Sequence, residues 1–301
     1  MKKITSPLRY PGGKHRVVER ILSLVSVDFS EYREPFLGGG SVFIALKQMF
    51  PEVRYKIGDL NRDLCSFWIT LKDNPKELID EVISIRNTCR CGKELYDRLA
   101  KCAESPDTFQ RAVRFFVLNR ITYSGTIDSG GYSAEAFEKR FTISNIAKLE
   151  PLSDLLQGVE IVNESYEKLL LEPGDNVFIY LDPPYWRSRK SKLYGKNGDL
   201  HVFFDHRRFA EDVRKCRHKW LMTCDDSDTM RGLFRFGNVL SWESFYGMTN
   251  VNGKKTNMGK ELFVANYSIQ PVPRQKPDLL SYIPRVHALE GQMNNDQHPT
   301  S

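Results

Sequence analysis

The segment from residue 32 to residue 50 constrains the fold more than any other part of the chain. An extended stretch runs into three consecutive glycines, Gly38, Gly39 and Gly40, and apolar residues then recur at helical spacing. This pattern predicts a strand, a tight turn and a helix, for which Ser41 is a candidate N-terminal cap.

A second predicted strand, residues 53–58, ends at Asp59, nineteen residues after Gly40. Glycines let a ligand approach the backbone at a helix N-terminus, and an acid about 20 residues further on can reach a ribose hydroxyl group. The spacing therefore favours a Rossmann-like nucleotide site. The run departs from the GxGxxG pattern, and glycine triplets also occur in ordinary loops, so this feature alone does not identify a ligand.

The rest of the chain divides into a helical block and a series of alternating strands and helices. Residues 64–149 show helical apolar spacing and end in turn-forming residues, which predict a projecting hairpin at about 119–133. Strands return at 159–162 and 177–181, and the second of these is a continuous apolar run, typical of a strand buried on both faces. A further helix and two strands are predicted at 209–216, 219–223 and 262–267.

These elements predict an α/β fold with a mostly parallel Rossmann-like sheet, helices on both faces and an inserted helical subdomain. We expect the sheet domain to be discontinuous, formed by residues 1–63 and 150–270. The insertion is predicted at 64–149, and the Pro-rich, polar segment 271–301 is expected to be a flexible tail.

The composition excludes several classes of protein. An aromatic content of 12% excludes a disordered chain, and no apolar run approaches the length of a membrane span. The first ten residues lack the apolar core of a signal peptide. The 6 cysteines show no CxxC spacing, and the single Cys89-x-Cys91 is a weak metal motif. We expect a soluble, cytoplasmic monomer with reduced thiols, no metal and no membrane partner.

The net charge of +6 is small for 301 residues, but it is unevenly distributed. Residues 1–20 carry six basic side chains against the single acid Glu19, and residues 186–219 carry eleven against four acids. Two interpretations remain open: a surface that binds nucleic acid, or a solvated basic helix face with its loop.

The most specific motif is Asp182-Pro183-Pro184-Tyr185, directly after the apolar run at 177–181. Ligands of open α/β sheets bind outside the carboxyl ends of the strands, where this motif is expected to lie. The two prolines remove amide donors and stiffen the chain, which leaves carbonyl oxygens and the Asp182 carboxylate as fixed acceptors. Rigid acceptors beside an aromatic ring suit the exocyclic amino group of a planar base. The alternative is a proline turn at a strand end.

Together with three other motifs, this tetrapeptide makes the chain resemble a known family, the Dam-type (D12 class) DNA adenine-N6 methyltransferases, which use S-adenosylmethionine. The matching motifs occur in the family's order over roughly residues 6–268, and weaker similarity continues after the last of them. They are SPLRYPGGKHRVVERIL at 6–22, EPFLGGGSVF at 34–43, IGDLNRDL at 57–64 and YLDPPYW at 180–186. The resemblance implies a Rossmann-like methyltransferase sheet whose helical insertion recognises the target.

The resemblance implies a cofactor role for several matching residues. Tyr10 and Lys14 would line the methionine end of the S-adenosylmethionine site, and Asp59 would hold the ribose hydroxyl groups. The floor of the site would be formed by Pro35, Phe36, Gly38 and Gly40. Taken singly, Lys14 can also be read as a solvated loop lysine and Asp59 as a helix cap.

The resemblance also implies roles for the DPPY motif. Asp182 would hold the target amino group and lie close to the cofactor, Pro183 would supply a main-chain acceptor, Pro184 would complete the rigid turn, and Tyr185 would stack on the base. Such a pocket requires that the adenine leave the duplex by base flipping. We therefore expect double-stranded DNA as the partner.

The expected DNA contacts fall in two segments. After the DPPY motif, Arg187, Arg189 and Lys190 are candidates for phosphate binding. In the hairpin the candidates are Asn119, Arg120, Tyr123, Ser124, Thr126 and Asp128. Arg120 is the first choice for a base-edge or phosphate contact. The alternative is that Asn119 and Arg120 anchor the hairpin to the helices.

The hairpin is where the sequence departs from the family's best-known members. They carry an FNGLxRxN-like segment, whereas this chain has YSGTIDSG, with Asp128 in place of an arginine. The GATC target of those members is therefore not assumed for this chain. Tyr10 also replaces the usual tryptophan of the first motif, which keeps an aromatic ring there.

Two other functions are compatible with parts of this sequence. Cytosine-N4 methylation uses the same amino-group chemistry, but Asp rather than Ser at 182 argues against it. A catalytically silent DNA-binding relative is disfavoured because Asp182, Tyr185, Lys14 and Asp59 are all present.

Overall fold

A computed structural model describes residues 3–10, 12–26, 28–101, 107–127, 130–186, 204–245 and 258–270. A seven-stranded sheet runs through the molecule in the order β3-β2-β1-β4-β5-β7-β6. The strands are β1 (Glu31–Glu34), β2 (Arg54–Gly58), β3 (Glu160–Val162), β4 (Val177–Leu181), β5 (Lys219–Asp225), β6 (Asn238–Phe245) and β7 (Met258–Ala265).

The sheet is parallel from β1 to β5, and β7 pairs antiparallel with β5 and with β6. The chain fills one half of the sheet with β1, β2 and β3 and then returns to pair β4 with β1. The order of the strands therefore reverses between β1 and β4. Such a switch point is where ligands bind in open α/β sheets.

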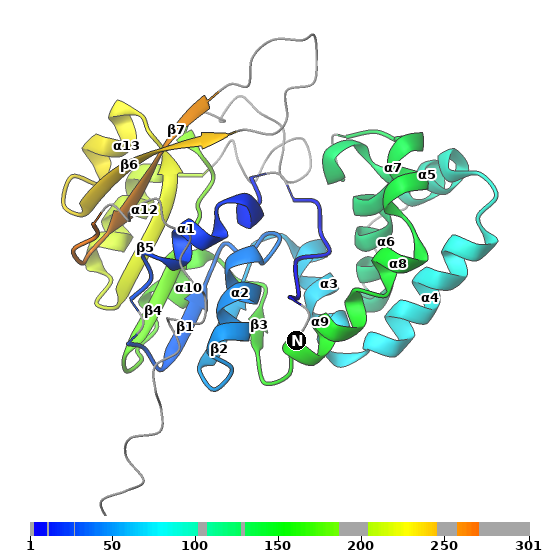
Figure 1. Cartoon of the computed structure of the whole chain (residues 1–301), viewed down its shortest axis with the longest axis horizontal. Helices are drawn as coiled ribbons and strands as arrows, with labels where there is room; N and C mark the ends of the chain where they lie inside the picture. The colour runs from blue at the N-terminus through cyan, green and yellow to red at the C-terminus, as the bar shows by residue number, and fades with distance from the viewer. Residues whose placement is uncertain are drawn as a thin grey trace, which may run out of the picture.

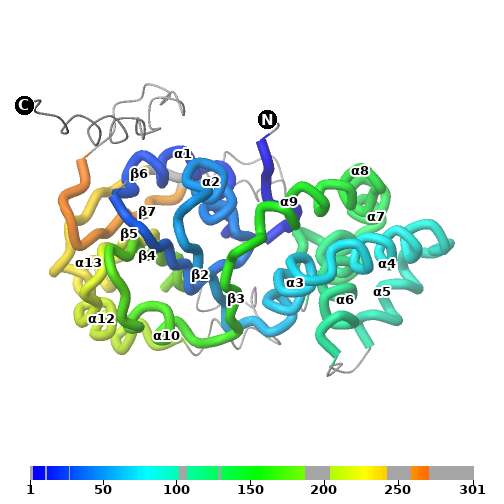
Figure 2. Tube along the Cα trace, turned by 90° about the horizontal axis from the view of Figure 1, so that it is seen from below, coloured from blue at the N-terminus to red at the C-terminus, as the bar shows by residue number. Residues whose placement is uncertain are grey.

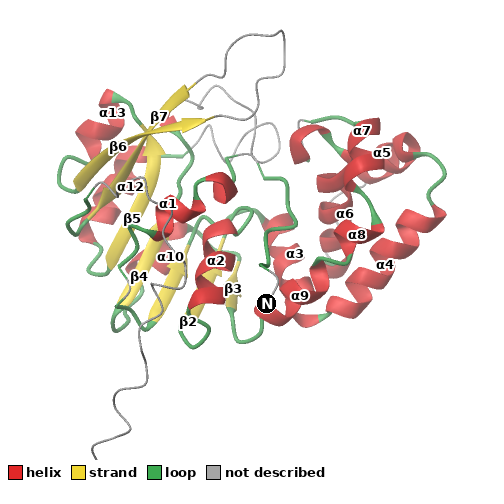
Figure 3. Ribbon diagram, in the orientation of Figure 1, coloured by secondary structure: helices red, strands yellow, loops and turns green. Residues whose placement is uncertain are grey.

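Helices cover both faces of this sheet (Figure 1, Figure 3). One face packs on α1 (Val18–Leu22) and α2 (Ser41–Met49), and the other packs on α10 (Tyr166–Leu171), α12 (His206–Lys215) and α13 (Asp228–Leu233). The position of β4 between these two layers of helices explains why its sequence is apolar throughout. Phe178 and Tyr180 join the core on the first face, whereas Val177, Ile179 and Leu181 join the core on the second.

A layer of helices lies beside the β3 side of the sheet (Figure 2). It comprises α3 (Arg62–Asp73), α4 (Pro75–Thr88), α5 (Gly92–Lys101), α6 (Thr108–Ile121), α7 (Ala134–Arg140), α8 (Ile143–Ile146) and α9 (Leu149–Leu155). α6 is its centre, with a run of buried residues from Phe115 to Ile121. Two short 3-10 helices complete the described elements, η1 (Lys14–Arg16) and η2 (Tyr123–Gly125).

The predicted Rossmann-like α/β fold, with helices on both faces of the sheet, is confirmed, two local predictions are corrected, and one strand is added. Ser41 is the first residue of α2 and not its cap, because Gly40 precedes the helix with a left-handed backbone (φ +66°). β6 was not predicted. The segment expected as a hairpin begins inside α6, and the described part is a loop closed by one bridge between Thr122 and Tyr132.

Candidate active site

The two most informative sequence motifs meet at the switch point of the sheet. The glycine-rich loop follows β1, the DPPY motif follows β4, and the two strands are parallel neighbours. Their carboxyl ends therefore lie side by side, and β2 delivers Asp59 to the same edge. The fold thus brings together residues that are more than a hundred positions apart in the sequence.

Both carboxylate oxygens of Asp182 accept a hydrogen bond from a side chain. The Lys14 ammonium lies 2.7 Å from Oδ2 and also donates to the carbonyl of Gly12 at 2.9 Å. The buried Thr223 hydroxyl on β5 donates to Oδ1 at 2.8 Å. Each carboxylate oxygen has two lone pairs, so Asp182 can still accept a hydrogen bond from a substrate.

The other residues of the DPPY motif are also held from neighbouring elements. The Tyr185 hydroxyl donates to Glu261 Oε2 of β7 at 2.9 Å, and the Lys14 nitrogen lies 5.0 Å from the centre of the Tyr185 ring. His206, at the start of α12, places Nε2 2.7 Å from the carbonyl oxygen of Pro184. Pro183 itself is buried. The motif is therefore fixed at its carboxylate, its ring and its backbone.

The glycine-rich loop closely contacts Tyr10. Gly38 and Gly40 have left-handed backbones, and a Cβ placed on Gly38 would lie 3.0 Å from two carbons of the Tyr10 ring. Asp59 supports the same loop, because its carboxylate accepts a hydrogen bond from the Gly38 amide at 3.0 Å. Burial raises the pKa of Asp59 to about 6, although hydrogen bonds from backbone amides oppose the shift.

Pro35 and Phe36 connect β1 to the glycines. Pro35 is buried, and the Phe36 ring stacks on Tyr166 with 5.7 Å between ring centres. Phe204 and Phe209 meet the Phe36 ring edge-on. This aromatic cluster fixes the path of the chain as it leaves β1, so the glycine turn starts from a rigid base.

Glu34, the last residue of β1, is a buried acid that the sequence analysis did not single out. It accepts a hydrogen bond from the Tyr32 hydroxyl at 2.7 Å. Burial raises its pKa to about 8, and the charges of Asp182 and Asp59 add to the shift. At neutral pH Glu34 therefore holds its proton, which limits the negative charge at this edge of the sheet.

Asn119 and Arg120 are buried and face the N-terminal segment. Asn119 is 0% exposed and hydrogen-bonds to both the amide and the carbonyl of Arg9, at 3.0 and 2.8 Å. Arg120 is 5% exposed and donates to the carbonyl of Pro7. Burial lowers the pKa of Arg120 to about 10, and the charges of Arg9 and Arg140 lower it further. These contacts fit the anchoring alternative and not a direct contact with DNA.

The loop that follows α6 presents few of the expected DNA contacts on its surface. Tyr123 is 62% exposed, and its neighbour Ser124 has a left-handed backbone (φ 53°). Thr126 is buried, and its hydroxyl donates to the carbonyl of Tyr123 at 2.8 Å, which closes the loop. The remaining predicted contacts lie outside the described residues: Asp128, Arg187, Arg189 and Lys190.

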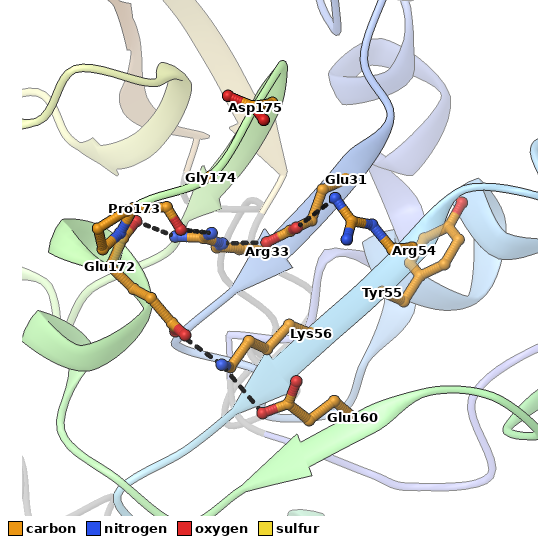
Figure 4. A pocket seen from close by; sticks show the side chains of 10 residues that line it. All are labelled: Glu31, Arg33, Arg54, Tyr55, Lys56, Glu160, Glu172, Pro173, Gly174 and Asp175. Carbon is orange, nitrogen blue, oxygen red and sulfur yellow. Dashed lines mark hydrogen bonds and ion pairs between the residues drawn. The ribbon is translucent and has the colours of Figure 1, made fainter.

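A cavity of about 390 Å³ lies at the other end of the sheet, where β1 to β4 begin (Figure 4). Charged groups that pair with one another line it. Arg33 donates to Glu31 and to the carbonyls of Leu169, Glu172 and Pro173, and Lys56 lies between Glu160 and Glu172. Because acids and bases alternate, the cluster fits a cross-link between strands better than a site for a ligand of one charge.

Within the described part of the chain, no cluster of His, Cys, Asp and Glu has an arrangement suited to a metal ion. No described helix combines the length and the apolar character needed to cross a membrane.

Four residues of the site escaped the sequence analysis: Glu34, His206, Thr223 and Glu261. Glu34 lies inside the glycine-rich motif, whereas His206, Thr223 and Glu261 lie in the stretches of weaker similarity that follow the DPPY motif. The other three come from α12, β5 and β7, and their proximity to the DPPY motif follows from strand order. The position of Glu261, for example, follows only from the antiparallel pairing of β7 with β5, which no motif in the sequence indicates.

Comparison with known proteins identifies a family whose model matches this chain, and relatives with similar sequences. The model of a family described as D12 class N6 adenine-specific DNA methyltransferase matches residues 10–248. A type II methyltransferase of Lactococcus lactis subsp. cremoris is 25% identical over 284 residues, which cover 86% of this chain and 94% of that protein. A DNA adenine methylase of Vibrio cholerae serotype O1 is 30% identical over 189 residues, which cover 62% of this chain and 66% of that protein.

Proposed function

The chain belongs to the D12 class of N6 adenine-specific DNA methyltransferases, and from this premise we propose a role for each residue of the site. Its reaction is the methylation of adenine N6 in DNA. We propose that S-adenosylmethionine is the methyl donor, that double-stranded DNA is the substrate, and that the target adenine is flipped out of the helix. The observation that carries the proposal is the position of Asp182, fixed by Lys14 and Thr223 beside the glycine-rich loop.

The residues around the glycine-rich loop fit S-adenosylmethionine. Gly38 and Gly40 have left-handed backbones, and a Cβ on them would crowd the ring of Tyr10 or Trp68. Asp59, at the end of β2, has the position and chemistry of an acceptor for ribose hydroxyl groups. Tyr10, Lys14, Pro35 and Phe36 would complete the site. When bound, S-adenosylmethionine supplies an electrophilic methyl group.

The DPPY motif would hold the adenine amino group. The Asp182 carboxylate and the Pro183 carbonyl each accept one N–H bond, which turns the nitrogen lone pair out of the plane of the base. Positive charge would develop on this nitrogen as it bonds to the methyl carbon and the bond from that carbon to the sulfur of the donor breaks. Asp182 would stabilise that charge and accept the proton that leaves the nitrogen. Tyr185 would stack on the base, with its ring fixed through Glu261.

DNA would approach the edge of the sheet that carries the site. Tyr123 is the exposed aromatic residue of the loop after α6, and with Ser124 it is our candidate for contact with bases. We retain Arg187, Arg189 and Lys190 as candidates for phosphate contact because they follow the DPPY motif directly in the sequence. We expect the enzyme to act in the cytoplasm as a monomer.

A transfer assay tests this assignment. The purified protein is incubated with radiolabelled S-adenosylmethionine and unmethylated genomic DNA, and the digested nucleosides are separated. We expect label in N6-methyladenine. Asp182→Ala should lower the rate at least about 100-fold, as expected for loss of a group that stabilises charge in the transition state, while binding of S-adenosylhomocysteine remains measurable.

The exposed Asp154 of α9 offers a matched control, because α9 leads into the beginning of β3, at the end of the sheet opposite to the site. Asp154→Ala should leave the rate unchanged. Label in N4-methylcytosine would point to the alternative reaction. Absence of labelled N6-methyladenine, or full activity of Asp182→Ala, would refute the proposal.

A further inference from the structure

The N-terminal residues 4–10, which we call the strap, run between the sheet and the helical layer (Figure 1, Figure 2). Gln48 of α2 fixes the beginning of the strap, because its side chain hydrogen-bonds to the amide and the carbonyl of Ile4 at 2.8 and 3.0 Å. Arg120 of α6 holds the middle through the carbonyl of Pro7. The strap is thus attached both to a helix of the sheet and to a helix of the layer.

Asn119 holds the end of the strap and also the loop that follows α6. Its carboxamide oxygen accepts from the Arg9 amide at 3.0 Å, and its nitrogen donates to the Arg9 carbonyl at 2.8 Å. The same nitrogen donates to the carbonyl of Gly125 at 3.2 Å. One fully buried side chain therefore joins two backbone segments that are more than a hundred residues apart.

The loop also packs directly against the strap. Gly125 lies so close that a Cβ on it would be 2.2 Å from the Arg9 carbonyl oxygen. The Arg9 guanidinium in turn donates to the carbonyl of Thr122 at 3.3 Å. A movement of this loop must therefore displace Arg9, or break the hydrogen bonds that tie the two segments together.

The residue after Arg9 belongs to the proposed cofactor site. The Tyr10 ring covers Gly38, and Lys14, four residues further along, pairs with Asp182. Asn119 thus binds the backbone of Arg9, and the residues that follow include Tyr10, the aromatic residue of the proposed cofactor site, and Lys14, the cation beside Asp182.

We propose that Asn119 is a positioning residue that couples the DNA-recognition loop to the cofactor site through the strap. The inference rests on the proposed function and deepens it. DNA that binds to the loop would hold Arg9 and Tyr10 in place, and this favours cofactor binding. Because coupling between two binding equilibria is reciprocal, bound cofactor strengthens DNA binding by the same factor.

The test measures the affinity of the full-length protein for S-adenosylhomocysteine, with and without saturating unmethylated duplex DNA. In the wild type we expect DNA to strengthen binding at least about fivefold, within the usual range of coupling between sites. Asn119→Ala should weaken binding about tenfold without DNA, as expected for the loss of buried hydrogen bonds, and should reduce the enhancement by DNA. Measurements are made well below the midpoint of thermal unfolding, so that a loss of stability alone does not change the affinity.

Two further variants keep the test decisive. Asn145→Ala removes a partly exposed asparagine whose amide also donates to a backbone carbonyl, that of Arg140, and should behave as wild type. Gly125→Ala keeps Asn119 and adds a methyl group against Arg9. It should therefore also reduce the enhancement of S-adenosylhomocysteine binding by DNA. If Asn119→Ala does not fold, this variant alone tests the proposal.

The possible outcomes separate the two proposals. Wild-type affinity and wild-type enhancement in both Asn119→Ala and Gly125→Ala would overturn the inference, as would a wild type whose affinity does not respond to DNA. A wild type that binds no S-adenosylhomocysteine and transfers no methyl group would instead refute the proposed function.

Discussion

Asp182 is held by a chain of hydrogen bonds that begins in the core of the sheet. Because the Thr223 hydroxyl donates its proton to Asp182, the Tyr180 hydroxyl, 2.8 Å away, must donate to Thr223. Burial, together with the charge of Asp182, raises the pKa of Tyr180 well above its ordinary value, so this residue remains a donor. The orientation of the carboxylate is therefore set by two buried side chains that do not contact the substrate in our proposal.

We predict that Thr223→Val lowers kcat about tenfold, because it removes the donor to Asp182 and leaves the Tyr180 hydroxyl without its acceptor. The KM for S-adenosylmethionine should change little, since the glycine-rich loop is untouched. Thr223→Ser keeps the hydroxyl group and should restore most of kcat. Steady-state kinetics of the two variants check this prediction. A Thr223→Ser enzyme as impaired as Thr223→Val would show that the methyl group matters and not the hydroxyl.

At the scale of elements, the buried charges at the beginning of the strands hold β1 to the segment before β4. The Arg33 guanidinium is 2% exposed and makes four hydrogen bonds, of which three are to backbone carbonyls at the end of α10 and directly after it. Glu31 also pairs with Arg54, but that side chain is 71% exposed. The two arginines share one acid and differ in burial.

This difference gives a matched pair of variants. Arg33→Met should lower the free energy of unfolding by about 3 kcal/mol, because it removes one of the two cations that pair with Glu31 and a buried donor to three backbone carbonyls. Arg54→Met should lower it by less than about 1 kcal/mol, as for an exposed ion pair. Chemical denaturation of both proteins provides the measurement. Equal losses of stability would contradict the assignment of Arg33 as the cross-link.

The elements that could be predicted are those whose sequences carry a strong local pattern. The apolar run at 177–181 gave the observed bounds of β4, and the helical spacing within 64–149 agrees with helices such as α4 and α5. β6 was missed because it is an edge strand that mixes polar and apolar residues and pairs with β7 alone. The predicted hairpin extended too far back, because Asn119 and Arg120 complete the last turn of α6.

At the scale of the whole molecule, some of the positive charges near the N-terminus make contacts inside the protein. Lys14 is paired with Asp182, and Arg9 donates to the backbone of the loop after α6. Internal contacts of Lys14 and Arg9 thus account for part of the local excess of positive charge, so this excess does not by itself indicate a DNA-binding surface. Contacts such as Asn119 with Arg9 join residues 110 positions apart, and no periodicity or motif in the sequence predicts them.

The most direct test of the account is to sequence the genomic DNA of a host that lacks DNA methylation, after expression of this chain, with detection of modified bases. We predict N6-methyladenine at one short recurrent sequence, and none in cells that express Asp182→Ala. Unmodified adenine in cells that contain the intact, folded protein, or modification confined to cytosine, would contradict the assignment of this chain as an adenine-N6 methyltransferase.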